Sequence, residues 1–487
     1  MHILPCIHVR KLLCARYKMK AVSSLLLLGA LAAATADRRP NILFILADDL
    51  GYGDLGTYPH GNGTNSHGLI QTPHLDQLAA QSLRFTDAYA GAPVCAPSRC
   101  TLMTGRHTGH CTVRSNGPIL NESDVTVADV LKKAGYVTAL VGKWGLGGNG
   151  TVAFPLEKGF DHFYGYTSQE NAHDYYPPFL WLQDAQDMIP QNEKASVAKC
   201  GTPLTTHCVW AQDLFVNMTE KWLDMFAENK DQPFYLFLSF TTPHAGGVGS
   251  NSETGVPVPE AIMPYSSHTD WPQVERDFAS VITRQDAQVG IVLKKLEEAG
   301  LDQDTVVFYA SDNGAHNEGG HNYRFFESSG PLQGYKRSLH EGGIRSPLLI
   351  RWPGVTKPGV THQQWGFFDF LQTAAALAGV KDGDLPPNLD GYSLLPTLMG
   401  EEQSQPDFNY FEYCHPNEDK SGWGQAVRFG DWKALKFVNG NGHVELYNLA
   451  EDLHEDNDVS SKNPEQLAMA KKLMEQAHVQ GNYCNGH

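Results

Sequence analysis

Short apolar runs alternate with amphipathic helical segments, and this alternation constrains the fold more than any other feature of the sequence. The runs lack the polar residues that a half-exposed strand shows, so we expect strands buried on both faces. Helical spacing follows Thr72-Pro73, recurs at residues 127–134, and recurs again before Gly300. Such strand–helix–strand units predict an α/β fold, with a mainly parallel central sheet flanked by helices. The predicted strands are residues 41–47, 137–141, 234–240, 305–310 and 347–350.

The pattern changes after residue 400. Residues 427–437 and 444–449 are expected to form antiparallel strands around a turn at Asn439-Gly440, and Asn463-Pro464 is expected to cap a final helix. We therefore predict a large α/β domain at residues 37–400 and a small C-terminal α+β subdomain with an antiparallel sheet at residues 401–487.

The first 36 residues have the pattern of a signal peptide. Basic residues precede an apolar stretch at residues 21–34, and Ala34-Thr35-Ala36 forms a small-residue cleavage site. The apolar stretch is shorter than the roughly 20 residues that a membrane span needs. We expect a secreted or lysosomal protein that passes through the secretory pathway. Glycosylation sequons, which fit such a glycoprotein, stand at Asn62, Asn121, Asn149 and Asn217.

The net charge argues against two classes of partner. It is −17. The predicted signal peptide contains basic but no acidic residues, so the net charge of the mature chain is more negative still. Such a chain repels nucleic acid and anionic membrane surfaces. A site for an anionic substrate would therefore need locally clustered basic residues.

The cysteines imply that one thiol has a special role. Of nine cysteines, Cys6 and Cys14 fall in the signal peptide, which leaves an odd number in a compartment that favours disulfides. Cys95 is the candidate for chemistry. The expected bridges are Cys200–Cys208 and Cys414–Cys484, with Cys100 and Cys111 undecided.

Acidic and amide residues follow two of the predicted strands. Asp48-Asp49 ends the first, and Asp312-Asn313 ends the fourth. Ligands in parallel sheets bind at the carboxyl ends of the strands, and oxygen donors suit Ca²⁺ or Mg²⁺ better than zinc. A solvated glycine-rich turn is the alternative reading of either pair alone.

Between these pairs lies Cys95-Ala96-Pro97-Ser98-Arg99, followed by Thr104-Gly105. In this spacing the sequence resembles the formylglycine-dependent sulfatases of the alkaline-phosphatase superfamily. Further matching motifs in the same order are Asp48-Asp49, Gly142-Lys143-Trp144, Thr242-Pro243-His244, Asp312-Asn313-Gly314, and Lys336 followed by Glu341-Gly342-Gly343-Ile344-Arg345.

The resemblance implies an arylsulfatase-like hydrolase of aryl or carbohydrate sulfate esters. Cys95 would be oxidised to formylglycine by a formylglycine-generating enzyme acting on the unfolded chain. A thiolate is a soft ligand poorly matched to a hard cation, whereas an aldehyde hydrate supplies oxygen. The family's ligands map onto Asp48, Asp49, Asp312, Asn313 and residue 95, around one Ca²⁺ per chain, with Mg²⁺ as the alternative.

The resemblance also assigns roles to basic residues. Arg99 would stabilise the hydrate, and Lys143, Lys336 and His244 would contact the sulfate oxygens where charge develops. His244 or Lys336 would donate a proton to the leaving alcohol. An imidazole titrates nearest working pH, which favours His244.

One position departs from the family pattern. The family reads Gly-Lys-Trp-His-Leu-Gly where this chain has Gly142-Lys143-Trp144-Gly145-Leu146-Gly147. The missing histidine is the family's base for regenerating the aldehyde. His173 is a candidate substitute, and a solvated loop histidine is its alternative reading.

Two other functions compete with sulfate ester hydrolysis. One is phosphonate monoester or phosphodiester hydrolysis within the same superfamily, and the other is non-catalytic binding of a sulfated glycan. The loops at residues 58–70 and 174–208 are expected to form the pocket rim. Ring-stacking or packing roles are open for Tyr175, Tyr176, Trp181 and Trp210, and the sequence predicts neither the specific ester nor the oligomeric state.

Overall fold

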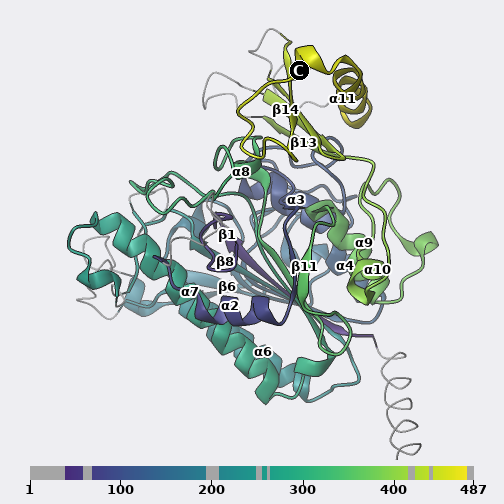
Figure 1. Cartoon of the computed structure of the whole chain (residues 1–487). Helices are drawn as coiled ribbons and strands as arrows, with labels where there is room; N and C mark the ends of the chain where they lie inside the picture. Colours follow the sequence, from purple (N-terminus) through teal and green to yellow (C-terminus); the bar gives the residue numbers. More distant parts are fainter. Residues whose placement is uncertain are drawn as a thin grey trace, which may run out of the picture. The chain divides into compact units, whose positions relative to one another are not determined.

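The computed structural model describes the greater part of the chain (Figure 1). The predicted signal peptide, the Asn439-Gly440 turn and parts of both predicted rim loops lie outside the described residues. Within the described residues, no helix combines the length and apolar character that a membrane span requires. The described ranges are 39–58, 69–193, 208–247, 255–259, 264–414, 423–437 and 442–479.

A ten-stranded mixed sheet forms the centre of the fold, in the order β11-β2-β10-β9-β1-β8-β4-β5-β6-β7. Its middle strands β9, β1, β8, β4 and β5 run parallel. β10 is antiparallel to β9, and β6 and β7 add an antiparallel hairpin. The strands are β1 (Asn41–Asp48), β2 (Leu83–Phe85), β4 (Val137–Lys143), β5 (His162–Tyr166), β6 (Phe179–Leu182), β7 (Ala185–Met188), β8 (Phe234–Pro243), β9 (Thr305–Ser311), β10 (Leu348–Arg351) and β11 (Gly359–Thr361).

Strand β1 shows why the apolar runs form the sheet. Its side chains alternate between two hydrophobic clusters: Leu43 and Ile45 pack in one, and Phe44 and Leu46 in the other. Both faces are therefore buried, as a run without polar alternation requires. Each fully buried side chain of this kind contributes about 1.5–3 kcal/mol relative to exposure.

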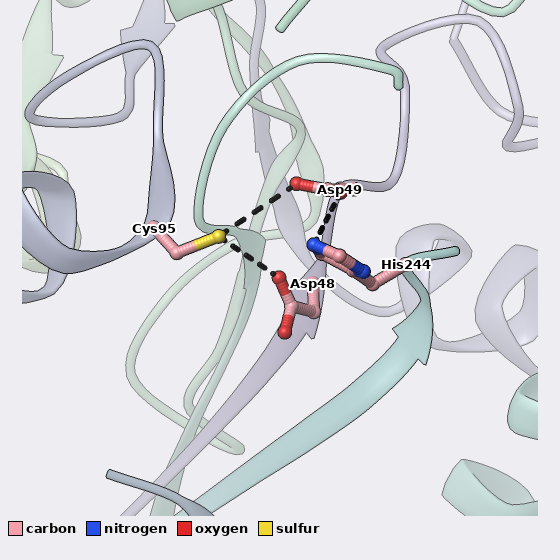
Figure 2. Close-up of side chains that lie close together, drawn as sticks. All are labelled: Asp48, Asp49, Cys95 and His244. Carbon is pink, nitrogen blue, oxygen red and sulfur yellow. Dashed lines mark hydrogen bonds and ion pairs between the residues drawn. The ribbon is translucent and has the colours of Figure 1, made fainter. Parts of the chain in front are cut away.

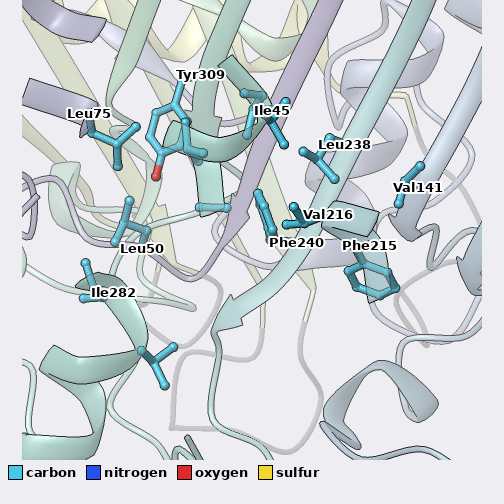
Figure 3. Close-up of a cluster of buried hydrophobic side chains, with 14 of the residues drawn as sticks. Ile45, Leu50, Leu75, Val141, Phe215, Val216, Leu238, Phe240, Ile282 and Tyr309 are labelled. Carbon is cyan, nitrogen blue, oxygen red and sulfur yellow. The ribbon is translucent and has the colours of Figure 1, made fainter. Parts of the chain in front are cut away.

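Helices cover both faces of the sheet (Figure 1). Helices α2 (Pro73–Ala80), α6 (Ala211–Ala227) and α7 (Gln273–Glu298) pack on the Ile45 side, as the cluster in Figure 3 shows. The Phe44 side carries α3 (Cys95–Thr104), α4 (Val127–Lys133) and α9 (Phe370–Leu377). The predicted α/β class is confirmed. Shorter elements are β3 (Ala88–Tyr89), β12 (Trp365–Gly366), α8 (Glu341–Ile344) and α10 (Leu395–Met399).

A separate antiparallel sheet follows, as predicted, but one of its expected strands is wrong. Residues 427–437 form two strands, because the chain reverses at Gly430 and Asp431, where Gly430 has a φ of 53°. A positive φ is readily adopted by glycine and ends the extended run. The strands are β13 (Asn409–Cys414), β14 (Trp423–Phe429), β15 (Trp432–Phe437) and β16 (Val444–Asn448).

The last helix, α11 (Pro464–Ala477), begins where Asn463-Pro464 predicts, but Asn463 does not cap it through its side chain. The amide Nδ2 of Asn463 instead donates to the carbonyl of Val459 at 3.0 Å. The start of the helix therefore depends on Pro464, whose fixed φ suits the first turn.

A buried ion cluster connects the small sheet to the α8 segment. Nζ of Lys433, on β15, lies 2.9 Å from carboxylate oxygens of both Glu341 and Glu455, and all three side chains are inaccessible to solvent. Apolar residues of the same two parts also belong to one buried cluster, among them Leu339, Ile344, Phe411 and Leu435. The domain boundary at residue 400 stays a prediction.

Candidate active site

The parallel strands bring four motifs to one edge of the sheet. β1 lies between β9 and β8, and β8 pairs in turn with β4. The four strands end at Ser311, Asp48, Pro243 and Lys143. The residues at and just after these ends therefore meet, as the rule for open α/β sheets predicts.

Asp48 and Asp49 point their carboxylates toward Cys95 (Figure 2). The Cys95 thiol lies 3.4 Å from Oδ1 of Asp48 and 3.9 Å from Oδ1 of Asp49. Asp49 has a φ of 66°, the left-handed region that Asp tolerates better than most residues. This turn after the strand lets two consecutive carboxylates face the same side, where an extended backbone would point them apart.

Asp312 and Asn313 complete the oxygen-rich group. The backbone N–H of Asp49 donates to Oδ1 of Asp312 at 3.1 Å, and Nδ2 of Asn313 donates to Oδ1 of Asp49 at 2.6 Å. Burial and the nearby Asp48 raise the pKa of Asp312 to about 6, although Arg99 opposes them. Buried carboxylates this close repel one another unless a cation compensates them.

These residues fit a hard divalent cation. Asp48, Asp49, Asp312 and Asn313 are all inaccessible to solvent, and Oδ1 of Asn313 is buried without a hydrogen-bond partner. A buried acceptor without a partner is costly, and a cation would satisfy it. Asp48, Asp49, Cys95 and His244 also present ligand atoms within 4.8 Å of one another.

Cys95 begins helix α3 and is buried. Burial and the neighbouring Asp48 raise the pKa of its thiol well above the usual range. The unmodified side chain is therefore a neutral thiol, which is a poor nucleophile and a poor ligand for a hard cation.

Arg99 and Lys143 pair with the carboxylates of this group. Arg99 donates through Nε to Oδ2 of Asp312 at 2.9 Å and through Nη1 to the Lys143 carbonyl at 2.9 Å. Nζ of Lys143 lies 2.6 Å from Oδ2 of Asp48. Burial would lower the pKa of Lys143, but Asp48 raises it, so the ammonium group stays charged.

Lys336 and His244 form a second basic pair. Nζ of Lys336 lies 2.9 Å from Nε2 of His244 and 2.8 Å from Oδ2 of Asp49. Nδ1 of His244 faces the carbonyl of Ala245, so Nδ1 carries the proton and Nε2 accepts from Lys336. Burial and Lys336 lower the pKa of His244.

Glu318 belongs to this site although the sequence motifs did not include it. Its carboxylate lies 2.8 Å from Nζ of Lys336 and also pairs with Arg337. Burial opposes ionisation, but Lys336 lowers the pKa of Glu318 to about 2. Its position shortly after β9 is the signal that could have identified it, since residues after parallel strands line the site.

His173 also reaches the site. Its imidazole stacks on His244 with ring centroids 4.1 Å apart and an interplanar angle of 21°. Burial and His244 lower the pKa of His173. The ring therefore lies beside the basic pair and is partly shielded from solvent, which differs from a solvated loop histidine.

The aromatic candidates divide into two kinds. Tyr175, Tyr176 and Trp210 are buried and serve packing, with the Tyr175 hydroxyl donating to the His244 carbonyl. Trp181 is partly exposed and lines a cavity of about 220 Å³. The other lining residues are Gly165, Tyr166, Thr167, Asn171, Asp174, Pro177, Pro178 and Phe179.

The cysteine predictions are resolved in part. Cys95, Cys100 and Cys111 are buried free thiols. Cys208 is disulfide-bonded, and its predicted partner Cys200 lies outside the described residues. The predicted Cys414–Cys484 bridge also falls outside the described side chains.

A second cluster joins His107, His110 and Asp390. Oδ1 of Asp390 lies 2.7 Å from Nδ1 of His110 and 3.6 Å from Nε2 of His107. The backbone N–H of Gly109 donates to Nδ1 of His107 at 3.1 Å, which leaves the ring proton on Nε2. A metal-bound imidazole needs the opposite arrangement, so this cluster clamps two segments instead of suiting a metal.

Comparison with known proteins identifies the family. Residues 40–380 match the sulfatase family model. The chain belongs to the sulfatase family. Residues 333–480 of this sulfatase also match the model described as N-sulphoglucosamine sulphohydrolase, C-terminal. The recognised resemblance is thereby confirmed.

Individual relatives agree with this placement. Human arylsulfatase A is 34% identical over 463 residues, covering 87% of this chain and 80% of the relative. Mouse N-acetylgalactosamine-6-sulfatase is 31% identical, covering 79% and 72%. The crystal structure of Ps i-CgsB superimposes with a TM-score of 0.72 at 25% identity, covering 92% of this chain and 95% of that one. This sulfatase is a sulfuric ester hydrolase.

Proposed function

We propose that this sulfatase cleaves aryl or carbohydrate sulfate esters with formylglycine made from Cys95 and one bound divalent cation. The observation that carries the proposal is the burial of Cys95 against the carboxylates of Asp48 and Asp49. A neutral thiol in that position has no evident catalytic use, whereas an aldehyde hydrate would supply oxygen to both a cation and a reaction.

The cation would be held by Asp48, Asp49, Asp312, Asn313 and the converted residue 95. When bound, such a cation polarises a sulfate oxygen and lowers the pKa of a coordinated hydroxyl group. We favour Ca²⁺ over Mg²⁺, and one cation per chain, because the family resemblance implies both.

The basic residues would bind the sulfate and move protons. Lys143 lies next to Asp48 and Lys336 next to Asp49, two of the three acidic ligands, so both ammonium groups are close to the proposed cation site. Arg99 is bonded to Asp312 and would support the hydrate at residue 95. Fixed charges of this kind stabilise developing negative charge without reorganisation.

The leaving alcohol would take its proton from the His244–Lys336 pair. We predicted His244 as the donor. Lys336 donates a hydrogen bond to Nε2 of His244, so one proton lies between the two side chains. We propose that the two residues deliver this proton together.

The sulfated substrate would reach a locally basic site on an acidic protein. Lys143, Lys336 and Arg99 answer the need for local basicity that the net charge of −17 imposes. The names of the relatives include arylsulfatase A and N-acetylgalactosamine-6-sulfatase, which supports a sulfated small molecule or glycan.

Conversion and export would share the secretory pathway. The predicted signal peptide, the disulfide at Cys208 and the exposure of the sequon residues Asn121, Asn149 and Asn217 support a secreted or lysosomal glycoprotein. We propose the formylglycine-generating enzyme as a partner during biosynthesis. Nucleic acid and stable membrane insertion are not part of the proposal.

The decisive experiment measures residue 95 and turnover together. The chain is coexpressed with a formylglycine-generating enzyme, and the mass of the tryptic peptide containing residue 95 is measured by mass spectrometry. Aryl sulfate, aryl phosphate and aryl phosphonate esters are then assayed in parallel, together with Cys95→Ala. We expect the peptide mass of an aldehyde or its hydrate, with sulfate release fastest.

Cys111→Ala is the matched control, because Cys111 is a buried thiol outside the site. It should retain turnover, whereas Cys95→Ala should lose it. A free thiol at residue 95 in active protein would contradict the formylglycine proposal. Faster phosphonate or phosphate release would favour the competing hydrolase function.

A further inference from the structure

A side chain at Gly145 would meet the carboxamide of Gln169. The φ of Gly145 is 75°, and a Cβ built there would lie 2.2 Å from Nε2 of Gln169. Nε2 of Gln169 donates to the carbonyl of Gly145 at 3.2 Å. The carboxamide of Gln169 therefore fills the space into which a side chain at residue 145 would project.

The segment that carries Gln169 is held against residues 144 and 145. The backbone N–H groups of Trp144 and Gly145 donate to the carbonyls of Tyr166 and Thr167 at 2.9 and 3.1 Å. These bonds continue the parallel pairing of β4 with β5 beyond the ends of both strands. These bonds fix the backbone up to Thr167, two residues before Gln169.

The same segment then places His173. The N–H of Gly247 donates to the carbonyl of His173 at 2.9 Å, and the N–H of Tyr175 donates to the carbonyl of Gly247 at 3.0 Å. Gly247 lies three residues beyond His244, so this ladder registers the backbone of His173 against the segment that follows β8. These two backbone bonds, at the carbonyl of His173 and the N–H of Tyr175, hold His173 in its stacking position on His244.

The electrostatic neighbours of His173 are those of the reaction. Lys143, Lys336, His244 and Asp49 all act on its imidazole. An imidazole that only packed would have no reason to lie among the groups that would hold the sulfate and the cation. His173 is also partly exposed.

We propose that His173 is the proton acceptor that releases sulfate from residue 95, and that Gln169 fills the volume left empty by Gly145. This inference rests on the proposed function. Two residues would then replace the family's histidine: Gln169 fills the space beside Gly145, and His173 accepts the proton.

The proposed step balances as follows. A ring nitrogen of His173 takes the proton from the free hydroxyl group of residue 95, so an O–H bond breaks and an N–H bond forms. The electron pair of that O–H bond becomes the second bond of the aldehyde carbonyl. The bond between the side-chain carbon and the oxygen attached to sulfur breaks. Sulfate leaves with the electron pair of this C–O bond.

The test uses the full chain after conversion of residue 95. Wild type, His173→Ala and His173→Gln are each mixed with an aryl sulfate, and the reaction is quenched. The mass of the peptide containing residue 95 is then measured by mass spectrometry. Alcohol release and sulfate release are followed separately. His173→Gln retains bulk against His244, so at least one variant should keep the wild-type unfolding temperature.

The control is His162→Ala. His162 stands at the opposite end of β5 and contacts Trp222, with ring centroids 5.6 Å apart. It should behave as wild type. The histidine variants at 173 should release sulfate at least about 10²-fold more slowly, since general base catalysis contributes 10²–10⁴-fold, and their residue-95 peptide should gain the mass of SO₃.

Two results would overturn the inference. One is wild-type sulfate release by a folded His173 variant. The other is a slow variant whose residue-95 peptide never gains SO₃, because His173 would then act before that stage or only support the structure. Failure of the wild type itself to release sulfate would instead refute the proposed function, so the two failures are distinguishable.

Discussion

Nζ of Lys143 lies 2.6 Å from Oδ2 of Asp48, and both side chains are completely buried. The pair joins a residue expected to bind sulfate to a residue expected to bind the cation. Changing Lys143 would take the nearest cation away from Asp48 and leave it with Arg99 at 3.6 Å, which couples the two halves of the site.

Replacing Lys143 with Met should therefore affect both activity and stability. We expect turnover to fall by about 10²–10³-fold, the usual cost of removing one donor to a developing charge. Unfolding free energy in a chelator should fall by less than the roughly 3–5 kcal/mol that an uncompensated buried charge costs, because Asp48 loses Lys143 but keeps Arg99 at 3.6 Å. Activity assays and denaturant unfolding measure the two effects.

Lys132→Met is the control for this substitution. Lys132 is half-exposed and forms a surface ion pair with Asp161 at 2.8 Å, and such a pair contributes at most about 1 kcal/mol. Wild-type turnover in Lys143→Met would contradict the proposal that Lys143 binds the sulfate group.

Removal of the cation should destabilise the folded chain. The charges of Asp48, Asp49 and Asp312 would then be balanced by lysine and arginine alone or with His244, and Oδ1 of Asn313 would have no hydrogen-bond partner. A ligand present at 1,000 times its dissociation constant contributes about 4 kcal/mol. A chelator should lower the unfolding temperature, and Ca²⁺ or Mg²⁺ should restore it better than Zn²⁺.

Asp312→Ala provides the comparison for the chelation experiment. Its unfolding temperature should respond weakly to the chelator, because one ligand is already lost. An unfolding temperature of the wild-type protein that does not change with the chelator would argue against a bound cation.

The His107 clamp predicts loss of stability in mild acid. Burial lowers the pKa of His107 to about 4, against the opposing effect of Asp390 and with a small further contribution from His110. A depressed histidine pKa means that the folded state prefers the neutral ring. Stability is then complete above the unfolded pKa of about 6.5 and is lost as the pH falls toward 4.

The expected loss from this residue is about 2 kcal/mol between pH 7 and pH 5. His107→Asn keeps an acceptor for the N–H of Gly109 but does not titrate. Unfolding curves at both pH values should show a smaller loss in the variant, and equal losses in the two proteins would refute the assignment.

The buried Lys433 should be essential for attachment of the small sheet. Lys433→Met removes the cation that Glu341 and Glu455 share and leaves Glu341 paired with Arg345 alone, and we expect a loss of up to about 3–5 kcal/mol. Thermal unfolding measures this loss of stability, and hydrogen exchange of the backbone amides in β13 to β16 shows whether it is located in the small sheet. Lys471→Met, an exposed residue on α11, should change stability little.

The sequence predicted the central strands well because burial on both faces leaves a continuous apolar signal, as in β1 and β8. It missed the reversal at Gly430 and Asp431, because the segments on both sides have strand-forming residues and the short turn was read as part of one strand. It placed Asp48, Asp49, Asp312 and Asn313 near one another through the rule for parallel sheets.

Glu318 and Gln169 escaped prediction for a different reason. Both lie in irregular segments, where no periodic pattern relates a residue to its neighbours in space. Gln169 matters through the volume at Gly145, which becomes visible only when the backbone of both segments is known. A missing side chain in a motif can thus be read from sequence, but its replacement cannot.

The order of the strands along the chain has a consequence for synthesis on the ribosome. β1 pairs only with β8 and β9, and neither is translated until the chain passes residue 233. The strand that carries Asp48 is therefore among the first to emerge and among the last to find its neighbours. During that interval its apolar surface and backbone groups are open to aggregation, so the nascent chain should depend on chaperones until β9 has been made.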